Sequence, residues 1–367
     1  MRISVFVALV VVVATTSWCS NAVAQSASVE HSTSGAQTAI DSQQSTMMFD
    51  INFTKLKSSK LATTLGIDAQ LEKVTQSDAG KPDPGKLVRV VGAMSMPESV
   101  AEAQTISSGK MPMNLYVRMQ FEDKEAADKM MAKAEAGTSG KVERDGKTFY
   151  RPKDDGKAPE NVLTHRVDPT TVEIATESSA FLANRDVLSQ GLQDAWALTG
   201  DDSIRLAIDV EAASGFISDA VEMGKARVKG SPQEAQVVGF LGLIDNMKNL
   251  RVALDFSNAN MLTLQATGVD ESEAKELEGG LDALLGLGKL MGGLQLQGLQ
   301  QQDPQAGAVV SQILNALDAS REGNEVSVAI PHPEGLEALA EKFAPMLGVG
   351  GARPTAPAQP SGLVPVP

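Results

Sequence analysis

Apolar and polar residues alternate along residues 115–121, with leucine, valine, methionine and phenylalanine on the odd positions. An alternation of period two is typical of a strand with one buried face. Beyond Glu122-Asp123 the period changes, and the alanines and methionines of 126–134 recur every three or four positions. That spacing places them on one stripe of an amphipathic helix. The segment therefore predicts a strand followed directly by a helix.

A second strand-to-helix step occurs about 150 residues later. Residues 262–266 alternate, but Val269 falls on the opposite parity, and Gly268 marks the place where a β-bulge would absorb the extra residue. The acidic pair Asp270-Glu271 then precedes a stripe of alanine and leucine at helical spacing, and acidic residues suit the positive end of a helix dipole. The two steps therefore follow one pattern.

Further blocks match in the same order. The matched pairs are 47–67 with 204–224, 86–96 with 249–258, 113–130 with 261–277, and 170–188 with 324–343. The first pair of blocks runs from a strand carrying an Asp into a helical stretch that we expect to close at Gly66 or Gly224. An ordered series of this kind predicts a tandem duplication, with one related half over 46–199 and the other over 200–347.

Each half also has a segment of its own. In the first half, residues 141–152 predict a hairpin that turns at Asp145-Gly146, a dipeptide suited to a type I′ turn. The second half carries a Gly/Leu-rich insertion, 279–302, in which leucine recurs at helical spacing among seven glycines. Because each interior glycine costs a helix up to about 1 kcal/mol, a stable free helix is not expected, and helix and mobile loop both stay open.

These patterns together predict an α+β fold of two tandem related halves, with a mostly antiparallel sheet and helices packed on one face. The Gly/Leu-rich insertion is expected to fold over its own sheet. The alternative is that it lies against a lipid, an acyl chain or a partner helix.

The two ends of the chain carry different signals. Residues 1–24 form a basic start, an apolar run of about fourteen residues and a small-residue site, so signal peptidase is expected to recognise Ala22 and Ala24 and to cut before Gln25. Residues 25–45 and the Pro/Ala-rich tail 348–367 have the composition of flexible segments. The predicted location is the periplasm or the medium.

Composition then limits the partners. Cys19 is the only cysteine and leaves with the signal, so the mature chain is free of disulfides. The formal charge is −14, and loss of Arg2 makes it −14 − 1 = −15. This acidity disfavours nucleic acid, and no transmembrane segment is expected after signal removal. The partner is left unknown, with an apolar ligand or a protein as the open classes.

Little in the sequence suggests catalysis. His31, His165 and His332 lack the spacing of zinc ligands and are interpreted as solvated loop residues, so no metal or other cofactor is predicted. Met94 and Met96 could present two thioethers to Cu(I), although methionine more often fills gaps in a core. Of the histidines only His165, on an expected strand, could act as the base of a hydrolase triad.

The segments "FDINFTKLKSSKLATTLGI", "FEDKEAADKM" and "GKTFYRP" resemble uncharacterised exported proteins of planctomycete-type bacteria, which repeat a sheet-and-helix unit behind a signal peptide. The resemblance spans most of 46–347 and implies no known activity. We therefore expect an exported, non-enzymatic protein that serves as a binding or scaffold module. The alternatives are a carrier of an apolar ligand or lipid in the cleft between the halves, and a hydrolase that uses His165.

Overall fold

The structure is a computed structural model, and it describes residues 45–64, 86–95, 99, 115–144, 146–153, 161–176, 190–197, 202–230, 242–257 and 259–343. The predicted cleavage site at Ala22, Ala24 and Gln25, the leader and the tail lie outside these residues, apart from Ser45 at the end of the leader.

The elements of the first half are β1 (Met47–Asn52), α2 (Phe53–Ser58), α3 (Lys60–Thr64), β2 (Leu87–Met94), β3 (Leu115–Phe121), α6 (Lys124–Ala136), β4 (Thr138–Arg144), β5 (Lys147–Pro152), β6 (Val162–Asp168), β7 (Thr171–Thr176) and α8 (Gln190–Ala197). Those of the second half are β8 (Ile204–Asp209), α9 (Ser214–Val228), β9 (Met247–Leu254), β10 (Asn260–Gly268), α11 (Glu271–Gln302), α12 (Pro304–Asn315), β11 (Ala319–Glu322), β12 (Glu325–Pro331) and α13 (Leu336–Phe343).

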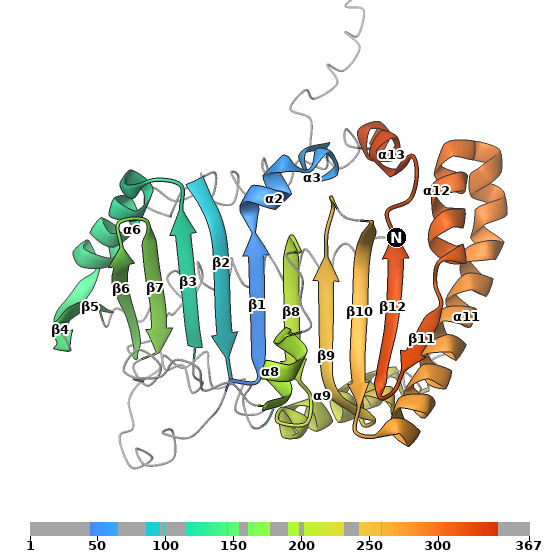
Figure 1. The fold of residues 1–367 in the computed structure, drawn as a ribbon, viewed down its shortest axis with the longest axis horizontal. Helices are drawn as coiled ribbons and strands as arrows, with labels where there is room; N and C mark the ends of the chain where they lie inside the picture. The colour runs from blue at the N-terminus through green and yellow to red at the C-terminus, as the bar shows by residue number, and fades with distance from the viewer. Residues whose placement is uncertain are drawn as a thin grey trace, which may run out of the picture.

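All these strands form one 12-stranded sheet in the order β11-β12-β10-β9-β8-β1-β2-β3-β7-β6-β5-β4. Every pairing in it is antiparallel. In Figure 1 the sheet runs across the whole view, with α2, α3 and α13 along its upper edge and α11 and α12 beside β11. The predicted α+β class and the antiparallel sheet are confirmed.

The two halves meet where β1 pairs with β8. From this junction outwards the strand order is β1-β2-β3-β7-β6 on one side and β8-β9-β10-β12-β11 on the other, so equivalent blocks of the sequence occupy equivalent places. The first half adds the hairpin β4–β5 beyond this set, and the second adds α12. Descent of the halves from one duplicated unit stays a prediction.

The sheet has one apolar and one polar face, because side chains alternate along each strand. The apolar face carries Phe49, Ile51, Val90, Val117, Met119, Ile204, Leu206, Val252, Leu264 and Val328. The polar face carries Asp50, Arg89, Arg118, His165, Glu173, Arg205, Arg251 and Gln265.

Helices α6 and α11 cover parts of the apolar face. Ala126 and Ala127 of α6 are buried in the first core with Phe49 and Val117, and Leu277 of α11 is buried in the second core with Val326. Helix α8 instead packs its Leu192 against Ala207, on the polar face. Helices α6 and α11 thus lie on one face of the sheet, as predicted, whereas α8 lies on the opposite face.

An aspartate caps the start of α6 and of α11, the helices that follow β3 and β10. The carboxylate of Asp123 accepts a hydrogen bond from the backbone N–H of Ala126 at 2.9 Å, and that of Asp270 accepts one from Glu273 at 2.9 Å. Such a bond satisfies one of the free N–H groups of a helix start and is worth about 1 kcal/mol. The acidic pairs therefore act as helix caps in both halves.

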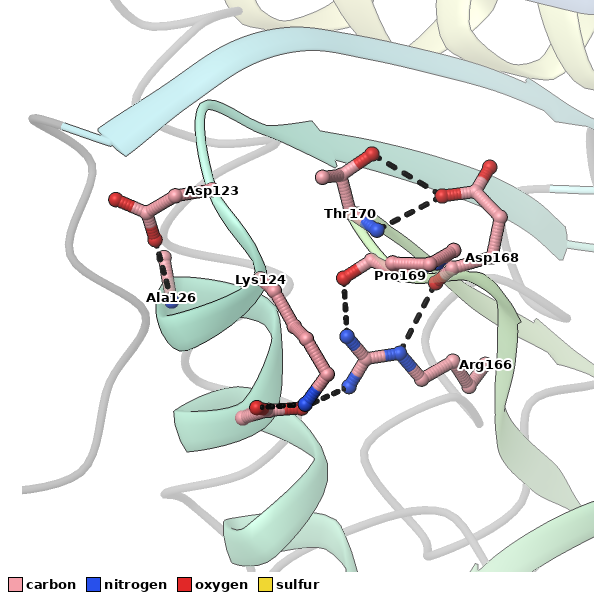
Figure 2. Close-up of polar contacts among 8 residues, drawn as sticks. Asp123, Lys124, Ala126, Arg166, Asp168, Pro169 and Thr170 are labelled. Atoms are coloured by element: carbon pink, nitrogen blue, oxygen red, sulfur yellow. Dashed lines mark hydrogen bonds and ion pairs between the residues drawn. The ribbon is translucent and has the colours of Figure 1, made fainter.

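Figure 2 shows how α6 is tied to the turn between β6 and β7. Arg166 reaches from β6 to Asp128 on α6, with 2.5 Å between Nη1 and Oδ1, and its guanidinium also donates to the carbonyls of Asp168 and Pro169. Asp168 in turn accepts from the backbone N–H of Thr170 at 2.8 Å. These contacts fix the helix over the sheet and form no site.

The Gly/Leu-rich insertion is helical, which decides between the helix and the mobile loop that the sequence left open. Helix α11 runs for 32 residues through all of 279–302. Its stability comes from packing, because Leu277 and Leu281 are buried and α12 lies against it. A Cβ on Gly280 would stand 2.1 Å from a methyl of Leu243, so this glycine allows a close approach.

Further expectations can be compared with the backbone. The pairing of β10 with β9 shifts register between Thr267 and Gly268, which confirms the predicted irregularity, and β4 and β5 form the predicted hairpin. Gly146 has φ +71°, as a type I′ turn requires, while Asp145 lies outside the described residues. Helix α9 continues to Val228, so the prediction that Gly224 ends it is wrong. Gly66 lies outside the described residues.

Candidate functional site

Burial is inverted at the centre of the sheet. On β8 the polar-face residues Arg205, Ala207 and Asp209 are buried, and the aliphatic residues between them are only half-buried. The same alternation runs along β9. The half-buried aliphatic side chains of the apolar face form what we call the aliphatic patch: Ile204, Leu206, Val252, Leu254, Leu262 and Leu264.

The aliphatic patch lies between the two cores. Ile204 and Leu206 touch the edge of the first core, and Val252 and Leu264 pair across β9 and β10. Because water normally drives such side chains under cover, partly exposed aliphatic residues on a central sheet face mark a surface suited to an apolar ligand.

Asp50 is the centre of an ion network on the polar face. Its side chain is 1% exposed and accepts from Arg89 Nε at 2.9 Å and Nη2 at 2.5 Å, and from Arg205 Nη2. Burial acts to raise the pKa of Asp50, but the hydrogen bonds from Arg89 and Arg205 outweigh it and hold the pKa below its ordinary value. The carboxylate thus joins β1 to β2 and to β8 across the junction of the halves.

Arg251 on β9 donates a hydrogen bond to a neutral amide instead of to a carboxylate. Its Nη1 donates to the amide oxygen of Gln265 at 2.9 Å, and Gln265 donates to Glu325 at 2.7 Å. Burial lowers the pKa of Arg251, with the nearby charge of Arg205 acting in the same direction. Asp202 opposes this shift, and burial raises the pKa of Asp202 itself.

A second ion pair lies farther along the polar face. Glu173 accepts from Tyr116 Oη at 2.8 Å and from Arg118 Nη2 at 2.8 Å. Arg118 pairs in register with Val91, which pairs with Asp50, so both ion pairs lie on one line across the sheet. Glu173 is buried while the side chain of Arg118 is 45% exposed, and the pair links β3 to β7.

The interpretation of the histidines as solvated loop residues is wrong for His165. His165 is 8% exposed, its Nδ1 lies 3.0 Å from the carbonyl of Thr148, and its ring is 4.6 Å from that of Phe149. It is therefore a packed residue of β6, as its strand position predicts, and this geometry gives the hydrolase alternative no support. His332 is half-buried with Nε2 out of solvent, while His31 lies outside the described residues.

The described methionines between residues 94 and 131 follow the packing interpretation. Met119 is buried in the first core, and Met94, Met130 and Met131 pack against it. Met96 lies outside the described residues. Within the described part of the chain, no group of three or more His, Cys, Asp or Glu side chains could hold a metal ion.

Sequence reasoning missed the polar face. Asp50 and Asp209 stood out as aspartates inside strands, but Arg89, Arg205 and Arg251 did not. The available signal was a charge at alternate positions of otherwise aliphatic strands, a pattern usually explained by a solvated face. On β8 and β9 that face is buried.

No protein-family model matches this chain, and no curated protein matches it either. Three solved structures of TP0453 are similar to it. Crystal form IV has 11% identity and a TM-score of 0.36, covering 83% of this chain and 95% of that chain. Form III has 10% identity and a TM-score of 0.34, covering 85% and 99%, and form I has 11% and 0.35, covering 86% and 100%. So distant a likeness carries no inference about function.

In the part of the chain that the structure describes, none of the helices has both the length and the apolar character that a bilayer span requires.

Proposed function

We propose that this chain is an exported, non-enzymatic binding module that carries an apolar ligand on the aliphatic patch. The inverted burial of β8 and β9 is the observation that supports this proposal. Charged side chains there are enclosed, whereas the aliphatic patch keeps part of its surface accessible. An acyl chain or similar ligand would remove that surface from water, at about 25 cal/mol per Å².

The shape of the patch favours an extended ligand. Leu254 pairs with Leu262 and Val252 with Leu264, so aliphatic side chains lie in adjacent rows across β9 and β10. Leu206 on β8 lies opposite Val252 and extends the row of Val252 and Leu264 towards β1, where the two halves meet. A ligand that bears only hydrocarbon at this surface leaves no polar group unpaired.

Binding of a fluorescent long-chain fatty acid to the purified mature chain tests the proposal. The variant Val252→Thr with Leu264→Thr keeps strand-forming residues but replaces hydrocarbon by hydroxyl, and we expect roughly tenfold weaker binding. Thr263→Val is the matched control, because it lies on β10 on the opposite face. Equal affinity of all three proteins, or no binding by the wild type, would exclude the patch as the ligand site.

Export is a separate part of the proposal and rests on the signal at residues 1–24. Mass spectrometry of the protein recovered from its host is expected to give a mature N-terminus at Gln25. A chain that retains Met1 inside the cell would contradict export. It would not bear on the proposal that the aliphatic patch binds a ligand.

A further inference from the structure

The sheet ends in two edge strands, β11 and β4, and its two ends differ. At one end α11 lies against β11, and Oδ1 of Asp282 accepts a hydrogen bond from the backbone N–H of Ala319 at 3.1 Å. Glu278 of the same helix pairs with Arg321 at 3.1 Å. Helix α11 therefore covers this edge and bonds to its backbone.

The other end is β4, and no described helix or strand lies beyond it at the left of Figure 1. Every residue of β4 is exposed or half-buried. Helix α6 packs over β5, β6 and β7 and meets β4 through the exposed ion pair of Glu135 with Lys141. An open edge of this kind offers backbone N–H and C=O groups to another strand.

The backbone groups that face outward from β4 belong to Lys141 and Glu143. Arg144 pairs with Lys147 on either side of the hairpin turn, so these two residues form the first hydrogen-bonded pair of β4 and β5. Hydrogen-bonded and non-hydrogen-bonded pairs alternate along an antiparallel ladder, so Val142 also bonds to β5. Lys141 and Glu143 consequently point their N–H and C=O groups away from β5.

Edge strands are usually protected against pairing, and β4 has two features of that kind. Its pairing shifts register between Thr138 and Gly140, which limits the regular edge to 140–144. It also carries charges, but the positive Lys141 and the negative Glu143 stand two residues apart on one face. Charges of both signs in this order do not repel an identical antiparallel strand.

Pairing of β4 with itself about Val142 satisfies the hydrogen bonds and the charges together. An antiparallel second copy with Val142 opposite Val142 sets Lys141 of each strand opposite Glu143 of the other. These are the residues with outward backbone groups, so each such pair exchanges two N–H···O=C bonds. A register that sets Lys141 opposite Lys141, or Glu143 opposite Glu143, keeps this bonding pattern but opposes like charges.

An apolar contact lies at the centre of this arrangement. Val142 is half-buried and packs against the small core of Phe149, Leu163 and Ala175. The two copies of Val142 form a non-hydrogen-bonded pair, in which the Cα atoms are about 4.5 Å apart. The second copy therefore covers the exposed part of Val142 and extends this core across the interface.

We propose that this chain pairs with a second copy of itself through the edge of β4, in an antiparallel register centred on Val142. The two sheets then continue as one through the dimer. This interface is separate from the aliphatic patch, because β5, β6, β7, β3, β2 and β1 lie between β4 and β8 in the sheet.

Disulfide trapping tests the register. The chain from Gln25 onwards contains no cysteine, so Val142→Cys introduces a single thiol. A disulfide spans Cα atoms about 4.5 Å apart, so mild oxidation should give a covalent dimer. Arg144→Cys is the matched control, because this exposed residue of the same strand lies opposite Gly140 of the second copy. A monomer after oxidation of Val142→Cys, or equal crosslinking of the two variants, overturns the proposal.

Sedimentation of the mature chain over a concentration series measures the strength of the dimer. We expect Lys141→Glu and Glu143→Lys each to weaken it about tenfold, since each opposes like charges at both pairs. The double variant restores opposite charges and should dimerise as the wild type does. Local damage from Lys141→Glu would persist in the double variant, because Glu135 still lies beside residue 141. The same exchange at Glu125 and Lys129, an exposed pair on α6, is the control and should leave dimerisation unchanged.

Three sedimentation results overturn the proposal. They are a wild-type chain that stays monomeric at every concentration, a dimer that neither single exchange weakens, and a double variant as weak as the single ones. Glu143→Pro gives a further measurement if a charge variant does not fold. The N–H that it removes faces outward, so the hairpin keeps its own bonds. A folded Glu143→Pro chain that dimerises as tightly as the wild type also overturns the pairing.

Discussion

Replacing Asp50 by asparagine tests the ion network that holds the junction of the halves. The substitution keeps the shape of the side chain and removes its charge, so Arg205, with a side chain 9% exposed, loses the counter-charge of Asp50 inside the protein. Breaking a buried pair in this way costs about 3–5 kcal/mol. Because the side chain of Arg89 is 39% exposed and can turn to water, we expect the lower end, about 3 kcal/mol.

Urea unfolding followed by circular dichroism measures this loss. Asp318→Asn is the matched control, because Asp318 is 75% exposed and pairs with Lys289 at the surface, where such a pair contributes less than about 1 kcal/mol. The double variant Asp50→Leu with Arg205→Met removes both charges and should lie closer to the wild type than Asp50→Asn. An Asp50→Asn chain as stable as the control would refute the reasoning.

The same network sets a pH dependence. The pKa of Asp50 is lower in the folded state than its unfolded value of about 3.9, so its stabilising contribution is complete above that value. It is lost as the pH falls below about 3.9 and through the lower folded pKa. Asp50→Asn should therefore show a weaker loss of stability than the wild type in this acid range, and parallel curves would argue against the assignment.

Two further pairs of substitutions compare packed with open positions. Gly268→Ala should destabilise the fold, because its Cβ would stand 2.6 Å from the backbone nitrogen of Ala274, whereas Gly286→Ala has open space and should stabilise α11 by up to about 1 kcal/mol; thermal midpoints that move in the same direction would contradict this. Leu277→Ala removes a fully buried side chain and should cost about 2–5 kcal/mol, while Leu294→Ala, 73% exposed, should cost less than about 0.5 kcal/mol, as urea midpoints can establish.

The order of strands and helices was predictable, because the spacing of apolar residues within each segment distinguishes a strand from a helix. Alternation in 115–121 and the capping aspartate of α6 identify a strand and a helix without knowledge of the rest of the chain. For α11 the sequence left helix and mobile loop open, because glycine propensity applies to a free helix. The packing of α12 and of Leu243 against its glycines comes from residues distant in sequence.

The candidate sites were less predictable for a related reason. Alternation gives two faces to a strand but does not say which face is enclosed. In β8 and β9 the enclosed face is the one with Arg205 and Arg251, and the half-buried one is aliphatic. That assignment depends on which helices cover the sheet, and α8 covers the face that hydrophobicity alone would leave to water.

The Asp50 network has a reason beyond stability, because β1 and β8 join two halves of similar strand order. Asp50 lies directly opposite Arg205, and a slip of one residue would set it opposite Ile204 or Leu206 and turn its charge to the aliphatic face. The ion pair therefore specifies one register at a junction where aliphatic pairing alone discriminates weakly. The double variant Asp50→Leu with Arg205→Met should consequently keep its stability but pair β1 with β8 of other copies, as judged by a larger oligomer fraction in size-exclusion chromatography with light scattering. If its oligomer distribution equals that of the wild type, alternation alone fixes the register.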